Sequence, residues 1–295
     1  MRLGAVFPQT EIGAEPEGVA HYVRELERMG FDHMVVYDHV LGAHPDRPGG
    51  WHGPYTHESL FHEPFVLFGY LAAITARLEL ATSVIILPQR QAALVAKQAA
   101  EVDVLTKGRL RLGVGIGWNA VEFEALGEDF RTRGRRIEEQ IALMRALWCD
   151  RVVDFKGKRH RVDRAGLHPL PVQRPIPVWM GGGYAAARTE IVEPALRRIA
   201  KIADGWLTHV QPGDERAIER FRELVRRAGR DPARVGLEGR VNAFRVRPED
   251  WPREIEWWRR VGATHVELNT MNAKYPAIDA HLEALRRFGD LVRAG

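Results

Sequence analysis

Cysteine is nearly absent from this sequence, because Cys149 is the only copy among 295 residues. A single cysteine excludes an internal disulfide and a zinc site built on several thiolates. Long apolar runs are also missing, and no stretch approaches the roughly 20 residues that a membrane-spanning helix needs. The N-terminus opens on an apolar strand pattern at 3–7, without the basic end and apolar core of a signal peptide. We therefore expect a cytoplasmic protein with no membrane partner.

Charge of one sign is in small excess only. Lys and Arg number 43 against 39 Asp and Glu, which gives a formal net charge of +4. The arginines are scattered over helical patterns such as 197–201 and 226–230, and no nucleic-acid readout module accompanies them. We expect no nucleic-acid partner, while a small positive balance suits an anionic small molecule.

What the sequence does contain is a regular alternation of strand and helix patterns. Strand patterns lie at 3–7, 33–37, 78–87, 110–116, 177–180, 205–209, 235–245 and 264–268. Helix patterns lie at 16–29, 63–75, 91–106, 134–148, 184–203, 214–228, 249–260 and 277–293. Eight strands, each followed by a helix, predict the α/β class and a (β/α)8 TIM barrel as a single domain over 1–295. A doubly wound open sheet is the alternative.

Two segments interrupt this alternation. Residues 41–62, directly after the second strand, form a long stretch rich in Gly, Pro, His and aromatic side chains. Loops of this length inside a compact domain are usually functional or disordered, so we expect a lid or substrate wall over the open face of the barrel. Residues 151–175 are interpreted as an insertion before the fifth strand, a hairpin turned at Gly157 that runs into several prolines.

Asp38 and His39 follow the second strand, where catalytic groups of such barrels are found. A histidine there can move a proton at neutral pH, and the adjacent carboxylate can orient it. We therefore predict a catalytic pair, with Asp38 holding His39. A capping aspartate beside a structural histidine is the alternative.

Four histidines in the 41–62 segment suggest a metal site, because imidazole is a common metal ligand. His44, His52, His57 and His62 are not spaced to share one helix face, and no His-Glu-x-x-His run exists. We assign no metal ligands. A metal-assisted barrel hydrolase that uses these histidines stays as an alternative of another class.

Glycines alternate at the end of the fourth strand, at Gly113, Gly115 and Gly117, and are followed by Trp118 and Asn119. The spacing is not the G-x-G-x-x-G of a dinucleotide-binding turn. Gly115 and Gly117 are expected to let backbone approach a bound ring or phosphate. Trp118 can wall such a site, and Asn119 can cap the next helix.

Three further glycines, Gly181, Gly182 and Gly183, join the fifth strand to the helix expected at 184–203. A glycine turn at a helix N-terminus offers free N–H groups and the positive end of the helix dipole, which predicts a phosphate cradle. A flexible turn is the alternative. The Lys and Ser or Thr of a P-loop are absent, so nucleotide hydrolysis is not indicated.

Several motifs spread over nearly the whole chain together resemble one family. They are Tyr37-Asp38-His39, Thr82-Ser83-Val84, Gly108-Arg109-Leu110 with the following glycines, Arg133-Gly134 before the helix with Glu138 and Trp148, and the run from Pro175 to Gly182. The chain resembles the bacterial-luciferase-like superfamily of flavin-type oxidoreductases, and within it the branch that uses coenzyme F420, a deazaflavin.

The resemblance implies where the cofactor lies. A non-proline cis peptide would prop the ring at Ser83 and Val84. The phosphate side would lie near Gly117, Trp118 and the glycine turn at 181–183. Asp38 and His39 would lie beside the reacting carbon. The family often has a glutamate where Trp118 stands here, so that acid is either missing or supplied by Glu122 or by the 41–62 segment.

The resemblance further implies hydride transfer between F420 and a small organic substrate, with His39 moving a proton. An FMN-dependent monooxygenase that uses reduced flavin and O₂ is the alternative, and so is a cofactor-binding protein without turnover. Trp251, Trp257 and Trp258 exceed what one buried helix stripe requires, so we expect them at the interface of a homodimer.

Overall fold

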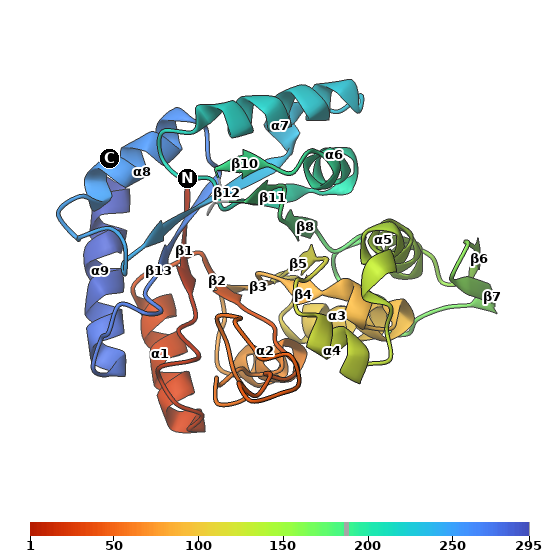
Figure 1. Cartoon of the computed structure of the whole chain (residues 1–295), viewed down its shortest axis with the longest axis horizontal. Coiled ribbons are helices and arrows are strands. Elements are labelled where there is room, and N and C mark those ends of the chain that lie inside the picture. The colour runs from red at the N-terminus through yellow and green to blue at the C-terminus, as the bar shows by residue number, and fades with distance from the viewer. Residues whose placement is uncertain (186–188, 295) are drawn as a thin grey trace.

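Eight parallel strands close into a barrel that helices surround (Figure 1). The computed structural model describes residues 1–185 and 189–294. The barrel strands are β1 (Arg2–Val6), β2 (His33–Val36), β3 (Glu79–Thr82) with β4 (Ile85–Ile86), β5 (Leu110–Gly115), β8 (Val178–Gly181), β11 (Gly205–Leu207), β12 (Gly236–Asn242) and β13 (His265–Asn269). Strands β3 and β4 form one interrupted barrel strand, since both pair with β5. The predicted (β/α)8 barrel is confirmed.

The order of the strands explains the closure. Around the barrel they run β3-β2-β1-β13-β12-β11-β8-β5-β4, and the pairing of β3 with β5 completes the ring. All of these pairings are parallel. The carboxyl ends of the strands therefore open on one face, which is where active sites of this architecture are built.

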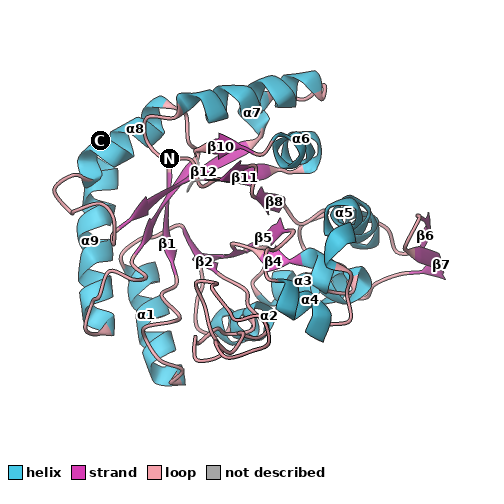
Figure 2. Cartoon of the chain, viewed as in Figure 1, coloured by secondary structure: helices cyan, strands magenta, loops and turns pink. Residues whose placement is uncertain are grey.

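The helices lie outside the ring of strands, as Figure 2 shows by colour. They are α1 (Pro16–Arg28), α2 (Pro64–Ala72), α3 (Ala92–Leu105), α5 (Arg133–Cys149), α6 (Glu193–Ile202), α7 (Glu215–Arg227), α8 (Trp251–Arg260) and α9 (Ile278–Ala294). Helix α1 illustrates the local cause, because Pro16 is preorganised for its first turn and Gly30, at φ +77°, follows its end. Its buried stripe, Val19, Val23 and Leu26, packs into the core between helices and barrel.

The structure adds two features to the expected alternation. A short helix, α4 (Ala120–Ala125), precedes α5, and the side chain of Asn119 caps it by accepting a hydrogen bond from the N–H of Val121 at 3.1 Å. The segment expected as one helix at 184–203 instead begins with β9 (Tyr184–Ala185) and β10 (Glu190–Ile191), which pair antiparallel before α6. The hairpin expected within 151–175 is present as β6 (Val153–Lys156) and β7 (Arg161–Ala165).

The inside of the barrel is unusually polar for this architecture, in which branched apolar side chains dominate. Alternate residues of β12 and β13 bring Glu238, Arg240 and Glu267 into it. The ring of Trp179 fills much of the remaining space, because a Cβ at Gly205 or Gly236 would lie 2.2 Å from its atoms. Charged pairs and one indole thus close the barrel below its open face.

The three tryptophans expected at a dimer interface are buried within the chain. Trp251 and Trp258 are 0% exposed, and Trp257 is 4% exposed. They pack into the core, and Trp257 donates a hydrogen bond to Glu215 at 2.6 Å, so the expectation of exposed aromatics on α8 was wrong. The homodimer stays a prediction without that basis. None of the described helices is both long and apolar enough to cross a bilayer.

Candidate active site

A cavity of about 900 Å³ opens at the carboxyl ends of the barrel strands. Residues at or directly after the carboxyl ends of β2, β3, β4, β5, β8, β11, β12 and β13 all contribute to its lining. A volume near the upper end of the usual range for ligand sites, about 300–1,000 Å³, can accommodate a tricyclic ring together with a second small molecule. Of the residues predicted from the sequence, the lining contains Asp38, His39, Ser83, Val84, Gly115, Gly117, Trp118, Gly181 and Gly182.

Two predicted site residues lie outside this lining. Asn119 is the cap of α4 and borders a smaller cavity of about 280 Å³ on the other side of His39. Gly183, at φ +78°, lies against α6, where a Cβ would be 2.9 Å from Leu196 Cδ1. Neither position faces the main cavity.

The peptide bond between Ser83 and Val84 is cis, as the family resemblance implied. It lies at the interruption between β3 and β4, on the cavity wall. Glycines on the neighbouring strands make room for Val84, because a Cβ at Gly115 would lie 2.5 Å and one at Gly181 2.9 Å from its methyl groups. Gly115 therefore makes room for Val84 and also lines the cavity, and its contact with a ligand stays a prediction.

Gly182 is the glycine of the 181–183 turn with open space beside it. Its φ is +113°, and a Cβ there would meet no atom within 4 Å. The turn leads into β9, and α6 begins only at Glu193. The expectation that a helix begins directly after this turn was therefore wrong, because the paired strands β9 and β10 come before α6.

His39 is held by Glu122 and not by its neighbour in the sequence. Its Nδ1 lies 3.2 Å from Oε1 of Glu122, and the N–H of Val40 donates to the same oxygen at 2.9 Å. The other oxygen accepts a hydrogen bond from Gln89 at 3.3 Å. Burial alone would raise the pKa of Glu122, but the hydrogen bond and charge of His39 outweigh it and lower that pKa.

Asp38 makes a different set of contacts. Arg90 donates to its Oδ1 at 2.8 Å, and the N–H of Ile86 donates to its Oδ2 at 3.2 Å. Burial raises the pKa of this carboxyl, with Arg90 opposing the shift. The expectation that Asp38 orients His39 was wrong, because adjacent residues at a strand end project in different directions. Asp38 ties the loop after β2 to the segment after β4.

The 41–62 segment forms one wall of the site. Tyr55 lines the main cavity, and the rings of Tyr55 and Phe61 lie 5.0 and 4.7 Å from the ring of His39. Trp51 stacks on Trp118 at 5.8 Å and donates a hydrogen bond to the carbonyl of Tyr55 at 2.7 Å. Aromatic side chains of this segment, together with Trp118, thus pack against His39.

The histidines of this segment do not assemble a metal site. The rings of His44 and His57 pack at 4.4 Å, whereas His62 packs on Phe7 at 6.0 Å. Among residues 1–185 and 189–294, none of them belongs to a group of three His, Cys, Asp or Glu side chains close enough to share an ion.

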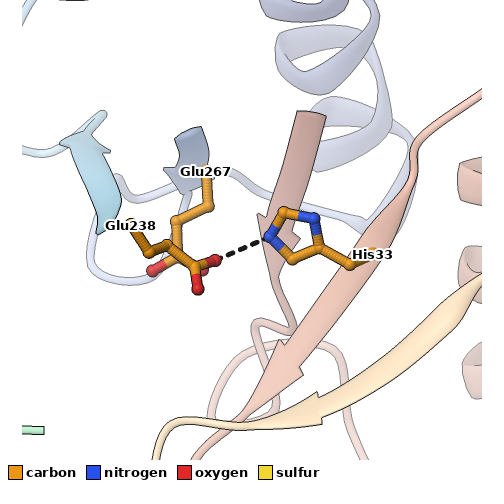
Figure 3. A group of neighbouring side chains, drawn as sticks. All are labelled: His33, Glu238 and Glu267. Atoms are coloured by element: carbon orange, nitrogen blue, oxygen red, sulfur yellow. Dashed lines mark hydrogen bonds and ion pairs between the residues drawn. The ribbon is translucent and has the colours of Figure 1, made fainter. Parts of the chain in front are cut away.

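The group that does converge is buried inside the barrel. Figure 3 shows His33, Glu238 and Glu267 pointing toward one another, with ligand atoms within 4.8 Å. His33 Nε2 lies 2.6 Å from Glu238, and arginines pair with both carboxylates, Arg111 with Glu238 and Arg240 with Glu267. Guanidinium groups thus already pair with both carboxylates that a metal ion would need, and a cation bound there would be repelled by them.

The sequence reasoning missed the polar half of the cavity. This wall comes from β11, β12, β13 and the residues after them, namely Gln211, Arg240, Asn242, Arg245, Asn269 and Asn272. The available signal was the period of two along 238–242 and 265–269, where polar residues alternate with apolar ones in strands otherwise read as buried.

Residues 1–282 match the model of a family described as luciferase-like monooxygenase. An uncharacterized protein of Mycobacterium tuberculosis is 30% identical over 292 residues, with 97% of each chain covered. An F420-dependent glucose-6-phosphate dehydrogenase of Segniliparus rotundus is 30% identical over 73% of this chain and 61% of its own length.

Another relative is named for a different cofactor. An FMNH₂-dependent dimethylsulfone monooxygenase of Pseudomonas fluorescens is 36% identical over 50% of this chain and 39% of its own length. Among solved structures, an F420-dependent secondary alcohol dehydrogenase superposes with a TM-score of 0.77 at 19% identity and covers 99% of both chains. At that identity, the likeness establishes the barrel fold alone.

Proposed function

This chain belongs to the luciferase-like monooxygenase family, whose members here are oxidoreductases and monooxygenases, and on that premise we propose that it is an F420-dependent oxidoreductase. The substrate is a small organic molecule that enters the same cavity. One observation carries the proposal, namely that a single cavity joins the Ser83–Val84 wall to a histidine whose other face is held by a carboxylate.

The residues present fit a flat ring. Val84 projects across Gly115 and Gly181, so this stretch of wall carries no side chain larger than valine. Gly182 offers backbone at open space beside it, which suits the approach of an anionic tail to N–H groups. When bound, F420 would supply the hydride chemistry, while the protein supplies binding and orientation.

His39 is the proposed proton-transfer group. With Nδ1 turned to Glu122, its Nε2 is the ring nitrogen left for a substrate, and no hydrogen bond from it is present within the described residues. The carboxylate fixes the ring orientation and the tautomer, as a partner of a working histidine does. Tyr55, Phe61 and Trp118 surround the imidazole and limit the access of water.

FMN is the second candidate cofactor. The relative from Pseudomonas fluorescens supports it with the higher identity but over half of this chain, whereas the F420-dependent relative aligns over 73%. Deazaflavin has carbon at the position where flavin has the nitrogen that helps to activate O₂. The choice between the two cofactors therefore decides whether the enzyme is a dehydrogenase or reductase or a monooxygenase.

Titration of the purified protein with F420 and with FMN distinguishes the two candidate cofactors. Trp118 is 46% exposed at the cavity, so quenching of its fluorescence reports occupation, and Trp118→Phe identifies its share of the signal. We expect saturable quenching by F420 at lower concentration than by FMN. Tighter binding of FMN, followed by O₂ consumption when the flavin is reduced, would support the monooxygenase instead. Binding of neither would overturn both.

A further inference from the structure

We propose that Arg240 is the cation that makes this cavity prefer the reduced form of its ring over the oxidised form, and that Glu267 is the positioning residue for Arg240. The inference rests on the proposed function and deepens it, since it assigns a role to a side chain on the wall that the family motifs in the sequence do not reach.

Three contacts orient the guanidinium of Arg240. Its Nε donates to Oε1 of Glu267, which is the next strand's residue at the same level of the barrel. Its Nη2 donates to Oγ of Ser83 at 3.1 Å, and its central carbon lies 5.3 Å from the ring centre of Tyr37. Arg240 is therefore fixed from three sides.

One end of the guanidinium is left for a ligand. Within residues 1–185 and 189–294, Nη1 of Arg240 makes no hydrogen bond, and Arg240 lines the cavity. Ser83, which its Nη2 contacts, directly precedes Val84 on the wall proposed to carry the ring. The guanidinium that carries the free donor is thus anchored to the residue next to Val84, on the wall where the ring is proposed to bind.

The charge of Arg240 is poorly compensated from the cavity side. Asp38 is the only carboxylate among the described lining residues, and Arg90 already pairs with it. Glu267 is 1% exposed, and its Oε2 has no hydrogen-bond partner in the described part of the chain. Burial and the charge of Glu238 raise the pKa of Glu267, with Arg240 opposing the shift.

The positive charge of Arg240 on the cavity wall would affect the oxidised and reduced forms of a bound ring differently. A ring that gains a hydride, one hydrogen with two electrons, and takes up no proton carries one more negative charge than the oxidised ring. A fixed cation beside it attracts that form more strongly, and the attraction is large where water is excluded. Charge placed near the ring is a recognised means by which a protein sets a cofactor's potential.

The test compares the dissociation constants of oxidised and reduced F420, and of oxidised and reduced FMN, for variants of the intact protein. We expect Arg240→Gln to lower the preference for the reduced form by about tenfold, which corresponds to about 30 mV for a two-electron couple. Arg240→Lys, which keeps the charge, is expected to retain most of the preference. Arg245→Gln is the matched control, because Arg245 lines the mouth of the same cavity and is expected to affect both forms alike.

A second pair of variants tests the positioning role. Glu267→Gln keeps an acceptor for Nε and is expected to retain or raise the preference, whereas Glu267→Ala is expected to lose it. If Arg240→Gln does not fold, these two variants still test the proposal. A weaker preference for the reduced ring in Glu267→Gln than in the wild type would contradict it. An unchanged ratio in a folded Arg240→Gln protein overturns the inference alone. Failure of the wild type to bind either ring overturns it together with the proposed function.

Discussion

Nδ1 of His39 lies 3.2 Å from Oε1 of Glu122, although the two residues are 83 positions apart in the sequence. One follows β2 and the other lies on α4, after β5. Because Glu122 also accepts the N–H of Val40 and a donor from Gln89, it joins three segments around the histidine. The group that orients the proposed proton-transfer residue is thus supplied by α4, the short helix that follows β5.

The first prediction concerns Glu122. Glu122→Gln keeps the shape of the side chain but removes the charge that fixes His39. We expect turnover to fall by up to about 10²-fold, as a misplaced reacting group does, with cofactor affinity retained. Steady-state kinetics with the cofactor that binds will measure this. Glu124→Gln on the exposed face of the same helix is the control and should leave turnover unchanged.

The second prediction concerns His39 itself. His39→Ala removes the proton-transfer group, so turnover should fall by about 10²–10⁴-fold. The dissociation constant of the cofactor, followed by quenching of tryptophan fluorescence, should change little. Equal turnover in the variant and the wild type would remove His39 from the mechanism.

The third prediction concerns the packing of Val84 against Gly115. In Gly115→Ala the new methyl group would lie 2.5 Å from Val84 Cγ2, so Val84 must move into the cavity. We expect weaker binding of the cofactor and a loss of about 1–3 kcal/mol in the free energy of unfolding. Gly69→Ala is the matched control, because Gly69 lies in α2 with open space around it. It should bind normally and gain up to about 1 kcal/mol.

The fourth prediction concerns the buried charges of the barrel. Burial would raise the pKa of Glu238, but Arg111 and His33 outweigh it and hold that pKa well below its usual value. An acid with a lowered pKa in the folded protein contributes stability that is present above its unfolded pKa, about 4.3, and is lost as the pH falls toward the folded value.

Glu238→Gln should therefore cost about 3–5 kcal/mol at pH 7, because buried Arg111 and His33 lose the charge of Glu238 and Arg111 keeps only Glu79 as a carboxylate partner among the described residues. The cost should shrink as the pH is lowered below 4. Chemical denaturation at several pH values measures both, with Glu58→Gln in the exposed 41–62 segment as the control. A cost that is independent of pH would mean that the lost charge is not what destabilises the variant.

The fifth prediction concerns metals. Because the loop histidines do not converge and arginines pair with the buried carboxylates, dialysis against a chelator should leave turnover and thermal stability unchanged. Elemental analysis should find less than one equivalent of any transition metal. Stoichiometric zinc that is needed for turnover would instead favour the metal-assisted hydrolase.

The barrel, its helices and the wall at Ser83 and Val84 followed from the sequence alone. Apolar runs with periods of about two and 3.6 residues specify strands and helices locally, and the alternation of the two leaves few arrangements that bury both faces of the strands. The motifs around His39, Ser83 and Trp118 sufficed to recognise the family and to place these residues on one cavity.

Partnership between distant side chains was decided by the tertiary structure. Adjacency suggested that Asp38 serves His39, whereas packing turned Asp38 to Arg90 and brought Glu122 to the histidine. The sequence pattern of α8 suggested that its three tryptophans lie on the surface, whereas they are buried in the core. A one-dimensional pattern gives the face on which a residue lies, but which polar group it meets depends on the curvature and register of strands far apart in the chain. For that reason the pairing of Arg240 with Glu267, and the place of Arg240 on the cavity wall, could be identified only from the closed barrel.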